Sequence, residues 1–329
     1  PFVMSVNSPD AHYPLHRQLN GLPTFPQTAA DVKTLPWIGV DNARLRKHVA
    51  DYYNCLARLD TGIGLLLEEL ENSGKAENTI VIYLGDHGAQ FSRGKTSVYE
   101  AGLRVPLIVR WPGYGKPGHV SHELVSSLDI LPTVLQGTNV KSPAGLDGRA
   151  LQPLLEGRFV KWREHLFAHK MGAAAHFYYP QVAVRDARYK LIANPLRRPN
   201  PPAQIYTDNS GVFFIAGTRK SEVAAASLLI QKAYATYHNP PPVELYDLQA
   251  DPYEFKNLAN DPKHAVAQKR LHSRLREWQR DTGDPLVDAA ALKRYTKEID
   301  EAAAMKPFLA YRRDKNFRWR YLDWMKPKP

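Results

Sequence analysis

The stretch 79–112, TIVIYLGDHGAQFSRGKTSVYEAGLRVPLIVRWP, constrains the fold of this chain more than any other feature. It starts with a continuous apolar run, 79–84, that is rich in β-branched and aromatic residues and typical of a strand buried on both faces. The run ends at Gly85-Asp86-His87-Gly88, and a second apolar run, 106–111, predicts another strand of the same sheet. Ligands of open α/β sheets bind at the carboxyl ends of the strands. The stretch therefore predicts an α/β domain with a binding site directly after residue 84.

A cation follows on the same side of the predicted strand. Lys95 lies within Arg93-Gly94-Lys95-Thr96, a Gly-containing turn that can fold back to the sheet edge. A carboxylate and an imidazole are ligands for a divalent metal, and a nearby ammonium attracts an anion. We therefore predict a metal-assisted anion site at Asp86, His87 and Lys95. Taken alone, the same residues are also compatible with an acid that caps a turn and an exposed turn lysine.

Composition allows a large domain and a smaller one and limits the classes of partner. The chain has 329 residues and a formal charge of +11, from 44 basic and 33 acidic residues. Such an excess indicates polyanionic partners (sulfated glycan, nucleic acid or membrane surface), although a solvated basic surface explains it equally well. Apolar runs are too short for a membrane span. The single cysteine, Cys55, excludes an internal disulfide framework.

Local patterns divide the chain into three parts. We expect a large α/β domain over 1–158, a smaller domain with an antiparallel sheet and a packing helix over 159–285, and a basic aromatic tail over 286–329. The first domain is predicted to hold a strand at 1–7 and a helix over 41–73. The predicted elements of the smaller domain are strands at 165–169, 181–185, 189–193 and 244–248, and helices at 221–238 and 263–282.

Six segments together resemble the sulfatase family of the alkaline-phosphatase-like superfamily, most similarly its N-sulfoglucosamine sulfohydrolase (heparan N-sulfatase) branch. They are SPDAHYP, DYYNCLARLDTGIG, GDHG, RGKTSVYEAGLRVP, LVSSLDILPTVL and ELYDLQADPYEFKNLA. The resemblance implies a central mixed sheet flanked by helices, incomplete at its N-terminus, with the smaller antiparallel domain behind it. It also implies hydrolysis of a sulfuric ester or sulfamate in a sulfated sugar or glycosaminoglycan, and a periplasmic, secreted or lysosomal location. On this reading no nucleic-acid partner is expected.

The resemblance assigns roles to eight side chains. Those expected to bind the metal or act in catalysis are Asp86 and His87 (metal) and Lys95 and His12 (catalysis). Those expected to contact substrate are Asp10, Arg93, His169 and His176. His12 follows an acid by two positions and precedes Pro14 by two, as in the family's segment, although a lone loop histidine also fits a surface turn. The implied metal is calcium, with manganese or magnesium as alternatives.

One departure from the family is large. The paired metal-binding aspartates and the C-x-P-S-R or S-x-P-S-R nucleophile motif of its N-terminal part do not occur in this sequence. Formylglycine, the nucleophile that the resemblance implies, is thus expected only in that missing part, and the chain alone is expected to have little or no turnover. A complementing N-terminal chain or a homodimer is an expected partner. Competing interpretations are a phosphohydrolase or phosphonate hydrolase of the same superfamily, and a non-catalytic polyanion-binding protein.

Overall fold

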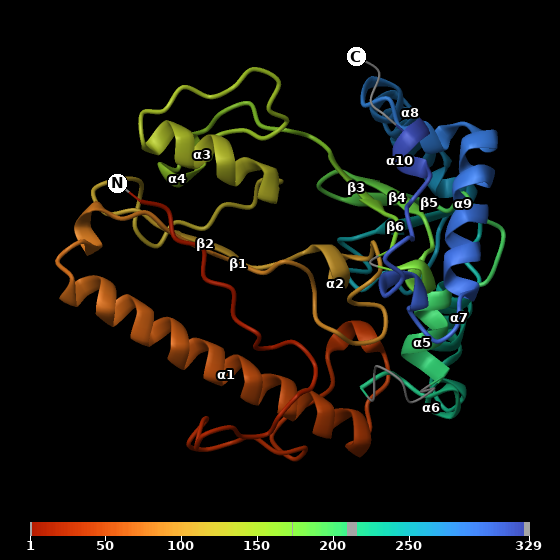
Figure 1. Cartoon of the computed structure of the whole chain (residues 1–329), viewed down its shortest axis with the longest axis horizontal. Helices are drawn as coiled ribbons and strands as arrows, with labels where there is room; N and C mark the ends of the chain where they lie inside the picture. Colours follow the sequence, from red (N-terminus) through yellow and green to blue (C-terminus); the bar gives the residue numbers. More distant parts are fainter. Residues whose placement is uncertain (1, 173, 209–215, 326–329) are drawn as a thin grey trace.

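The computed structural model describes residues 2–172, 174–208 and 216–325. They form two sheets, one of two strands and one of four. In Figure 1 the elements up to α4 occupy one part of the molecule, and the four-stranded sheet with helices α5 to α10 occupies the other. Among the described residues, every helix is too short or too polar to cross a lipid bilayer.

Helix α1, Ala43–Asn72, confirms the helix predicted at 41–73. Asn42 caps its start by accepting a hydrogen bond from the Leu45 amide at 3.0 Å. Leu45 and Val49 are fully buried and lie on one helix face, in line with their spacing. The second half of the helix is open, because Leu65 remains 59% exposed.

The central stretch forms two strands, as predicted. β1, Val81–Leu84, pairs antiparallel with β2, Leu107–Arg110, in the register Val81↔Arg110. Of the expected mixed sheet, the described residues form only this pair. The prediction that the first strand is buried on both faces is wrong: β1 is partly buried and Leu84 is exposed. Burial of both faces requires elements packed above and below the strand, and in the described chain β1 makes its main contacts with β2.

The strand predicted at 1–7 is also wrong. The described residues 2–7 adopt no regular structure and are exposed. A strand needs a neighbour for its backbone hydrogen bonds, and no described strand pairs with this segment. The apolar run Phe2-Val3-Met4 therefore indicates β-propensity without a partner.

The smaller domain contains the predicted antiparallel sheet, in the order β3-β4-β5-β6. Its strands lie within one residue of the predicted positions: Leu166–Lys170, Gln181–Arg185, Tyr189–Ala193 and Val243–Asp247. One face packs on α8, Ala265–Asp281, through residues such as Leu191 and Leu275. The opposite face, including Ile192 and Tyr246, joins a core cluster that contains Leu45 and Phe91 of the first part. The sheet thus lies between its own helix and the loop that follows β1.

The remaining helices are short or belong to the tail. The predicted helix at 221–238 is divided into two by residues 225–227. The bounds of the remaining helices are α2 Glu100–Leu103, α3 Ile130–Gly137, α4 Gln152–Leu155, α5 Pro201–Asp208, α6 Lys220–Ala224, α7 Leu228–His238, α9 Ala289–Ala304 and α10 Tyr321–Trp324.

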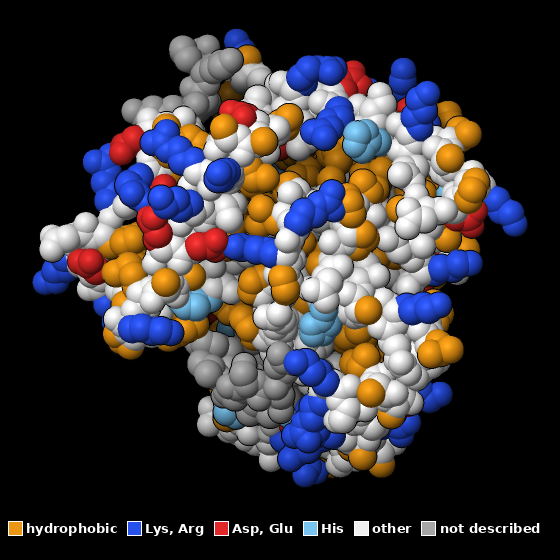
Figure 2. Space-filling model, turned by 90° about the vertical axis from the view of Figure 1, so that its right-hand side faces the viewer, with side chains coloured by type: hydrophobic (Ala, Val, Ile, Leu, Met, Phe, Trp, Pro, Cys, Tyr) orange, Lys and Arg blue, Asp and Glu red, His pale blue; other side chains and the backbone are white. Residues whose placement is uncertain are grey.

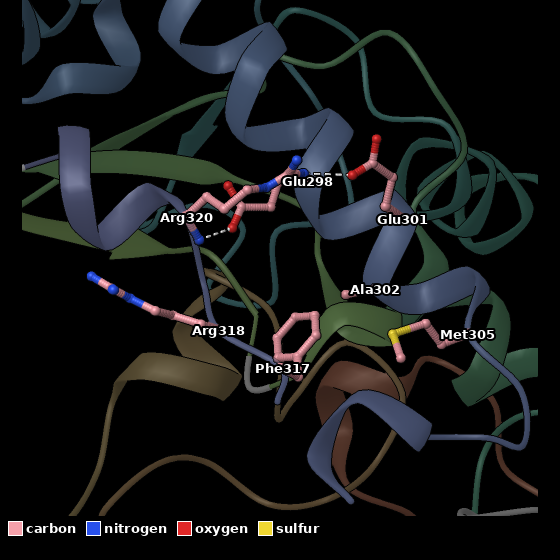
Figure 3. A pocket seen from close by; sticks show the side chains of 7 residues that line it. All are labelled: Glu298, Glu301, Ala302, Met305, Phe317, Arg318 and Arg320. Carbon is pink, nitrogen blue, oxygen red and sulfur yellow. Dashed lines mark hydrogen bonds and ion pairs between the residues drawn. The ribbon is translucent and has the colours of Figure 1, made fainter. Parts of the chain in front are cut away.

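The described residues of the tail that follow α9 fold back on this helix. Arg320 donates its amide to Glu298, and its guanidinium lies 2.5 Å from Oε2 of Glu301 (Figure 3). A cavity of about 270 Å³ lies beneath this contact. It is lined by Glu298, Glu301, Ala302, Met305, Phe317, Arg318 and Arg320, and so contains none of the predicted site residues.

Candidate functional site

Asp86 and His87 form an open acceptor pair just beyond β1. The Asp86 carboxylate is 86% exposed, and its Oδ2 lies 3.2 Å from Nε2 of His87. The other ring nitrogen, Nδ1, lies 3.0 Å from the Gly88 carbonyl, which can only accept. In a neutral imidazole Nδ1 therefore carries the proton, and Nε2 presents a lone pair to Asp86. With Nε2 deprotonated the pair can bind a cation, and with Nε2 protonated the same contact is an ion pair.

Glycine at position 88 is required for this loop to lie where it does. A Cβ there would come within 1.7 Å of the Ala101 carbonyl oxygen. The Gly88 amide donates to Gly102 at 3.0 Å, which fastens the loop to α2. The GDHG spacing thus allows the acid and the imidazole to leave the strand while the next residue packs against backbone.

Lys95 reaches the same edge from the following turn. The Lys95 amide donates to the Ala89 carbonyl at 2.9 Å, which returns the turn toward β1. Its side chain is partly buried. Burial lowers the pKa of the Lys95 ammonium, and the negative charge of Asp86 opposes that shift. The structure therefore places Lys95 within electrostatic range of Asp86, near the carboxyl end of β1.

His12 lies on a loop that contacts the loop following β1. Its Nδ1 is 2.7 Å from the Tyr13 carbonyl, and the Tyr13 amide donates to Oε1 of Gln90 at 3.4 Å. His12 is exposed. Asp10, on the same loop, is held by two hydrogen bonds from Arg58 of α1, at 3.0 and 3.1 Å. Its carboxylate thus anchors the loop to the helix.

The structure does not bring Arg93, His169 or His176 to Asp86. The Arg93 side chain is 1% exposed and surrounded by protein, out of reach of a sugar in solvent. His169 pairs in register with Val182 of the cluster that packs on α8. His176 packs against Phe308 of the tail in a tilted arrangement, with ring centroids 4.2 Å apart.

Sequence reasoning missed a buried group of charges beside the site, formed by Glu100, Lys190 and Glu254. Lys190 is 1% exposed although it lies in a strand between apolar residues. A charged residue within such a strand is the signal that was available, because a buried charge requires a partner. Sequence alone does not identify that partner.

The donor set accounts for part of a metal centre. Among the described residues, no three His, Cys, Asp or Glu side chains gather closely enough to hold a metal ion. Asp86 and His87 therefore offer two ligands of the larger number that calcium takes. Figure 2 shows that Lys and Arg predominate over Asp and Glu on the face that lies to the right in Figure 1, in line with the net positive charge.

Comparisons with known proteins agree on one family. The family model described as Sulfatase matches residues 1–140, and the model described as N-sulphoglucosamine sulphohydrolase, C-terminal, matches residues 85–197. N-sulphoglucosamine sulphohydrolase of Homo sapiens is 31% identical over 274 residues, covering 78% of this chain and 52% of the relative. The chain thus spans about half the length of this curated relative.

Solved structures show the same likeness. One, described as a complex with its substrate D-glucosamine-2-N,6-O-disulfate, has a TM-score of 0.53 and 25% identity, over 72% of this chain and 41% of its own. A phosphonate monoester hydrolase from Silicibacter pomeroyi has a TM-score of 0.51 and 25% identity, over 72% and 42%. These relatives support the predicted α/β fold class. With two family models spanning its first 197 residues and a sulfohydrolase relative along most of its length, the chain belongs to the sulfatase family.

Proposed function

We propose that this chain forms the C-terminal part of a metal-dependent sulfatase that hydrolyses sulfate esters or sulfamates of sulfated glycans. N-sulfoglucosamine-type sugars are the first substrates to test, because the sulfohydrolase relative and the disulfated-glucosamine complex both point to that class. The observation that carries the proposal is the arrangement after β1. There, the Asp86 carboxylate and the His87 imidazole lie 3.2 Å apart, with the Lys95 ammonium in electrostatic range.

Asp86 and His87 would hold one side of the metal. Carboxylate oxygen suits calcium, and the imidazole nitrogen keeps manganese and magnesium as alternatives. A divalent cation bound there supplies Lewis-acid polarisation of sulfate oxygens. The further ligands come from the N-terminal part of the enzyme, which this sequence does not contain.

Lys95 and His12 would act on the substrate. The Lys95 ammonium binds the sulfate group and balances the negative charge that grows on it during transfer. Partial burial makes this ammonium more effective, since water screens it less. His12, exposed on the loop beside Gln90, donates a proton to the departing amine or alcohol.

The nucleophile comes from outside this sequence, as a formylglycine made from the Cys or Ser of the family motif. We therefore expect little or no turnover from the chain alone. Exposed apolar side chains of α1, β1 and β2 support a covering polypeptide, for which we propose the family's N-terminal part. These side chains include Leu65, Leu66 and Leu67 of α1, Leu84 of β1 and Ile108 of β2, which is 62% exposed.

The test is co-expression with an N-terminal sulfatase segment that carries the C-x-P-S-R motif, followed by assays on N-sulfoglucosamine, 4-nitrophenyl sulfate and a phosphonate monoester. Sulfate release that depends on both polypeptides and on Asp86 supports the proposal. Faster cleavage of the phosphonate ester favours the second candidate, which the likeness to a phosphonate monoester hydrolase motivates. Heparin binding up to high salt, with no hydrolysis and no bound metal, favours a polyanion-binding protein. A homodimer with its apolar surface covered contradicts the proposed N-terminal partner.

A further inference from the structure

We propose that Glu254, in the smaller domain, is a positioning residue that holds the turn carrying Lys95 in place. The inference rests on the proposed function only in the role given to Lys95. The contacts themselves involve Tyr253, Glu254 and Phe255, which follow β6 and belong to the DPYEF segment. We call residues 85–100, which follow β1, the site loop. The three residues contact this loop at two points, one on each side of Lys95, and each contact is called a grip below.

The first grip is on Arg93, two residues before Lys95. Its Nη2 donates to the carbonyl of Tyr253 at 3.0 Å and to that of Glu254 at 2.7 Å, across about 160 sequence positions. Its guanidinium carbon lies 4.5 Å from the ring centroid of Tyr99 and 5.1 Å from that of Phe255. A guanidinium between two rings, with carbonyl acceptors in the interior, is fixed in direction. This explains why Arg93 is buried and does not face substrate.

The second grip is on Glu100, where α2 begins. Oε2 of Glu254 accepts the Glu100 amide at 2.6 Å. Lys190 of β5 bridges the two acids, 2.9 Å from Oε1 of Glu254 and 3.1 Å from Oε1 of Glu100. Arg185 of β4 also pairs with Glu100. The start of α2 is therefore tied to two strands of the other sheet through one carboxylate.

The turn between the grips needs external support. Arg93 and Thr96 have φ angles of 65° and 66°, and Glu254 has 58°, all in the left-handed region that disfavours side chains with a Cβ. Each such residue is strained and persists only where its surroundings enforce it. A Cβ on Gly94 would come within 2.3 Å of the Ala89 carbonyl oxygen, so the turn is already packed tightly against the Ala89 backbone.

The position of Lys95 relative to Asp86 consequently depends on the smaller domain. Releasing either grip allows the left-handed residues to return to relaxed angles, and the Lys95 side chain then swings away from the edge of β1. Glu254 contributes to both grips, through its carbonyl to Arg93 and its carboxylate to Glu100. Removal of its carboxylate alone tests the second grip without disturbing the first.

The test compares Glu254→Ala with Glu222→Ala in the full chain by amide hydrogen exchange. Glu222 pairs with Arg44 of α1 at 2.6 Å and also joins distant segments, but it does not touch the site loop. We expect Glu254→Ala to speed exchange of residues 93–100 by about tenfold or more, with α1 and α8 unchanged. Glu222→Ala leaves residues 93–100 at the wild-type rate. An unchanged rate in Glu254→Ala, or a rise spread evenly over the protein, overturns the proposal.

A second variant covers the case in which Glu254→Ala does not fold. Phe255→Leu removes one ring from Arg93 and keeps every charge, and it is expected to speed exchange of the same residues by about threefold. Failure of that segment to respond again overturns the proposal.

Turnover provides an independent readout. In the enzyme completed with its N-terminal part, Glu254→Ala is expected to lower kcat about tenfold relative to Glu222→Ala, because a displaced Lys95 no longer meets the transferring group. Equal kcat values for the two variants contradict the positioning role. Hydrogen exchange does not depend on catalysis. If the completed wild-type enzyme has no sulfatase activity but Glu254→Ala still speeds exchange of residues 93–100, the proposed function is refuted and the positioning role of Glu254 stands.

Discussion

The ammonium nitrogen of Lys190 lies 2.9 Å from Oε1 of Glu254, and each side chain is only 1% exposed. Burial raises the pKa of the Glu254 carboxyl, while the Lys190 ammonium opposes that rise. A charge in such an environment is tolerated because its partner is present, so loss of one partner leaves the other uncompensated.

Replacement of Lys190 by Met is therefore expected to lower the free energy of unfolding by about 3 kcal/mol or more. Equilibrium denaturation in urea measures the change. The control is Arg46→Met, which removes an exposed ion pair with Asp41 and is expected to have little effect. If the two variants lose similar amounts of unfolding free energy, the buried pair contributes no more to stability than an exposed one.

Replacement of Asp86 by Asn is expected to abolish activity of the completed enzyme. Loss of one carboxylate ligand weakens the metal site, and sulfate release should fall by about 100-fold or more. A chelator should have the same effect on the wild-type enzyme, reversed by added calcium. Asp281→Asn, an exposed acid at the end of α8, serves as the control and should keep full activity. Activity that survives both the substitution and the chelator argues against a metal at Asp86.

Replacement of Lys95 by Met should lower kcat of the completed enzyme by about 100-fold, because its ammonium no longer balances charge on the sulfate. Lys95→Arg keeps the charge but not its compact shape, so we expect a smaller loss. Steady-state assays on 4-nitrophenyl sulfate measure both, with Lys269→Met, at an exposed position of α8, as the matched control. If methionine and arginine at position 95 give the same rate, the charge of this residue has no catalytic role.

Lys170 should make the stability of the fold rise with pH between about 7 and 10.5. Its Nζ lies 5.7 Å from the ring centroid of Tyr179 and has no hydrogen-bond partner among the described residues, and burial lowers its pKa from 10.5 to about 7. Between these pKa values the unfolded chain binds more protons than the folded one, so the contribution of Lys170 to stability rises with pH. Below about pH 7 both states are protonated and the burial penalty is fully present.

We therefore expect Lys170→Met to be more stable than wild type at about pH 7, with a difference in Tm that shrinks toward about pH 9.5. Differential scanning calorimetry over that range measures it. Lys75→Met, at an exposed lysine, should show a difference in Tm that does not vary with pH. A Lys170→Met difference that is constant over the range would mean that Lys170 stays charged in the fold.

Much of the local structure was predictable from residues close together in the chain. The helix from Ala43 to Asn72 and the four strands of the smaller sheet follow from spacing and propensity, which depend on neighbours a few positions apart. The position of Asp86 and His87 was equally accessible, because a polar pair directly after an apolar strand must lie at its end. Lys95 could be expected beside them since Gly94 permits the tight return of the turn.

The sequence by itself therefore determined most of the helices and strands, the family resemblance and the acid, imidazole and lysine of the candidate site. Only the tertiary structure decided that Arg93 points inward to the Tyr253 and Glu254 carbonyls, that Asp10 binds Arg58, and that β1 remains partly open. The physical reason is range. Secondary structure is set by backbone geometry and side chains within a few residues, whereas the burial and pairing of a charge depend on groups that packing brings together from distant parts of the chain.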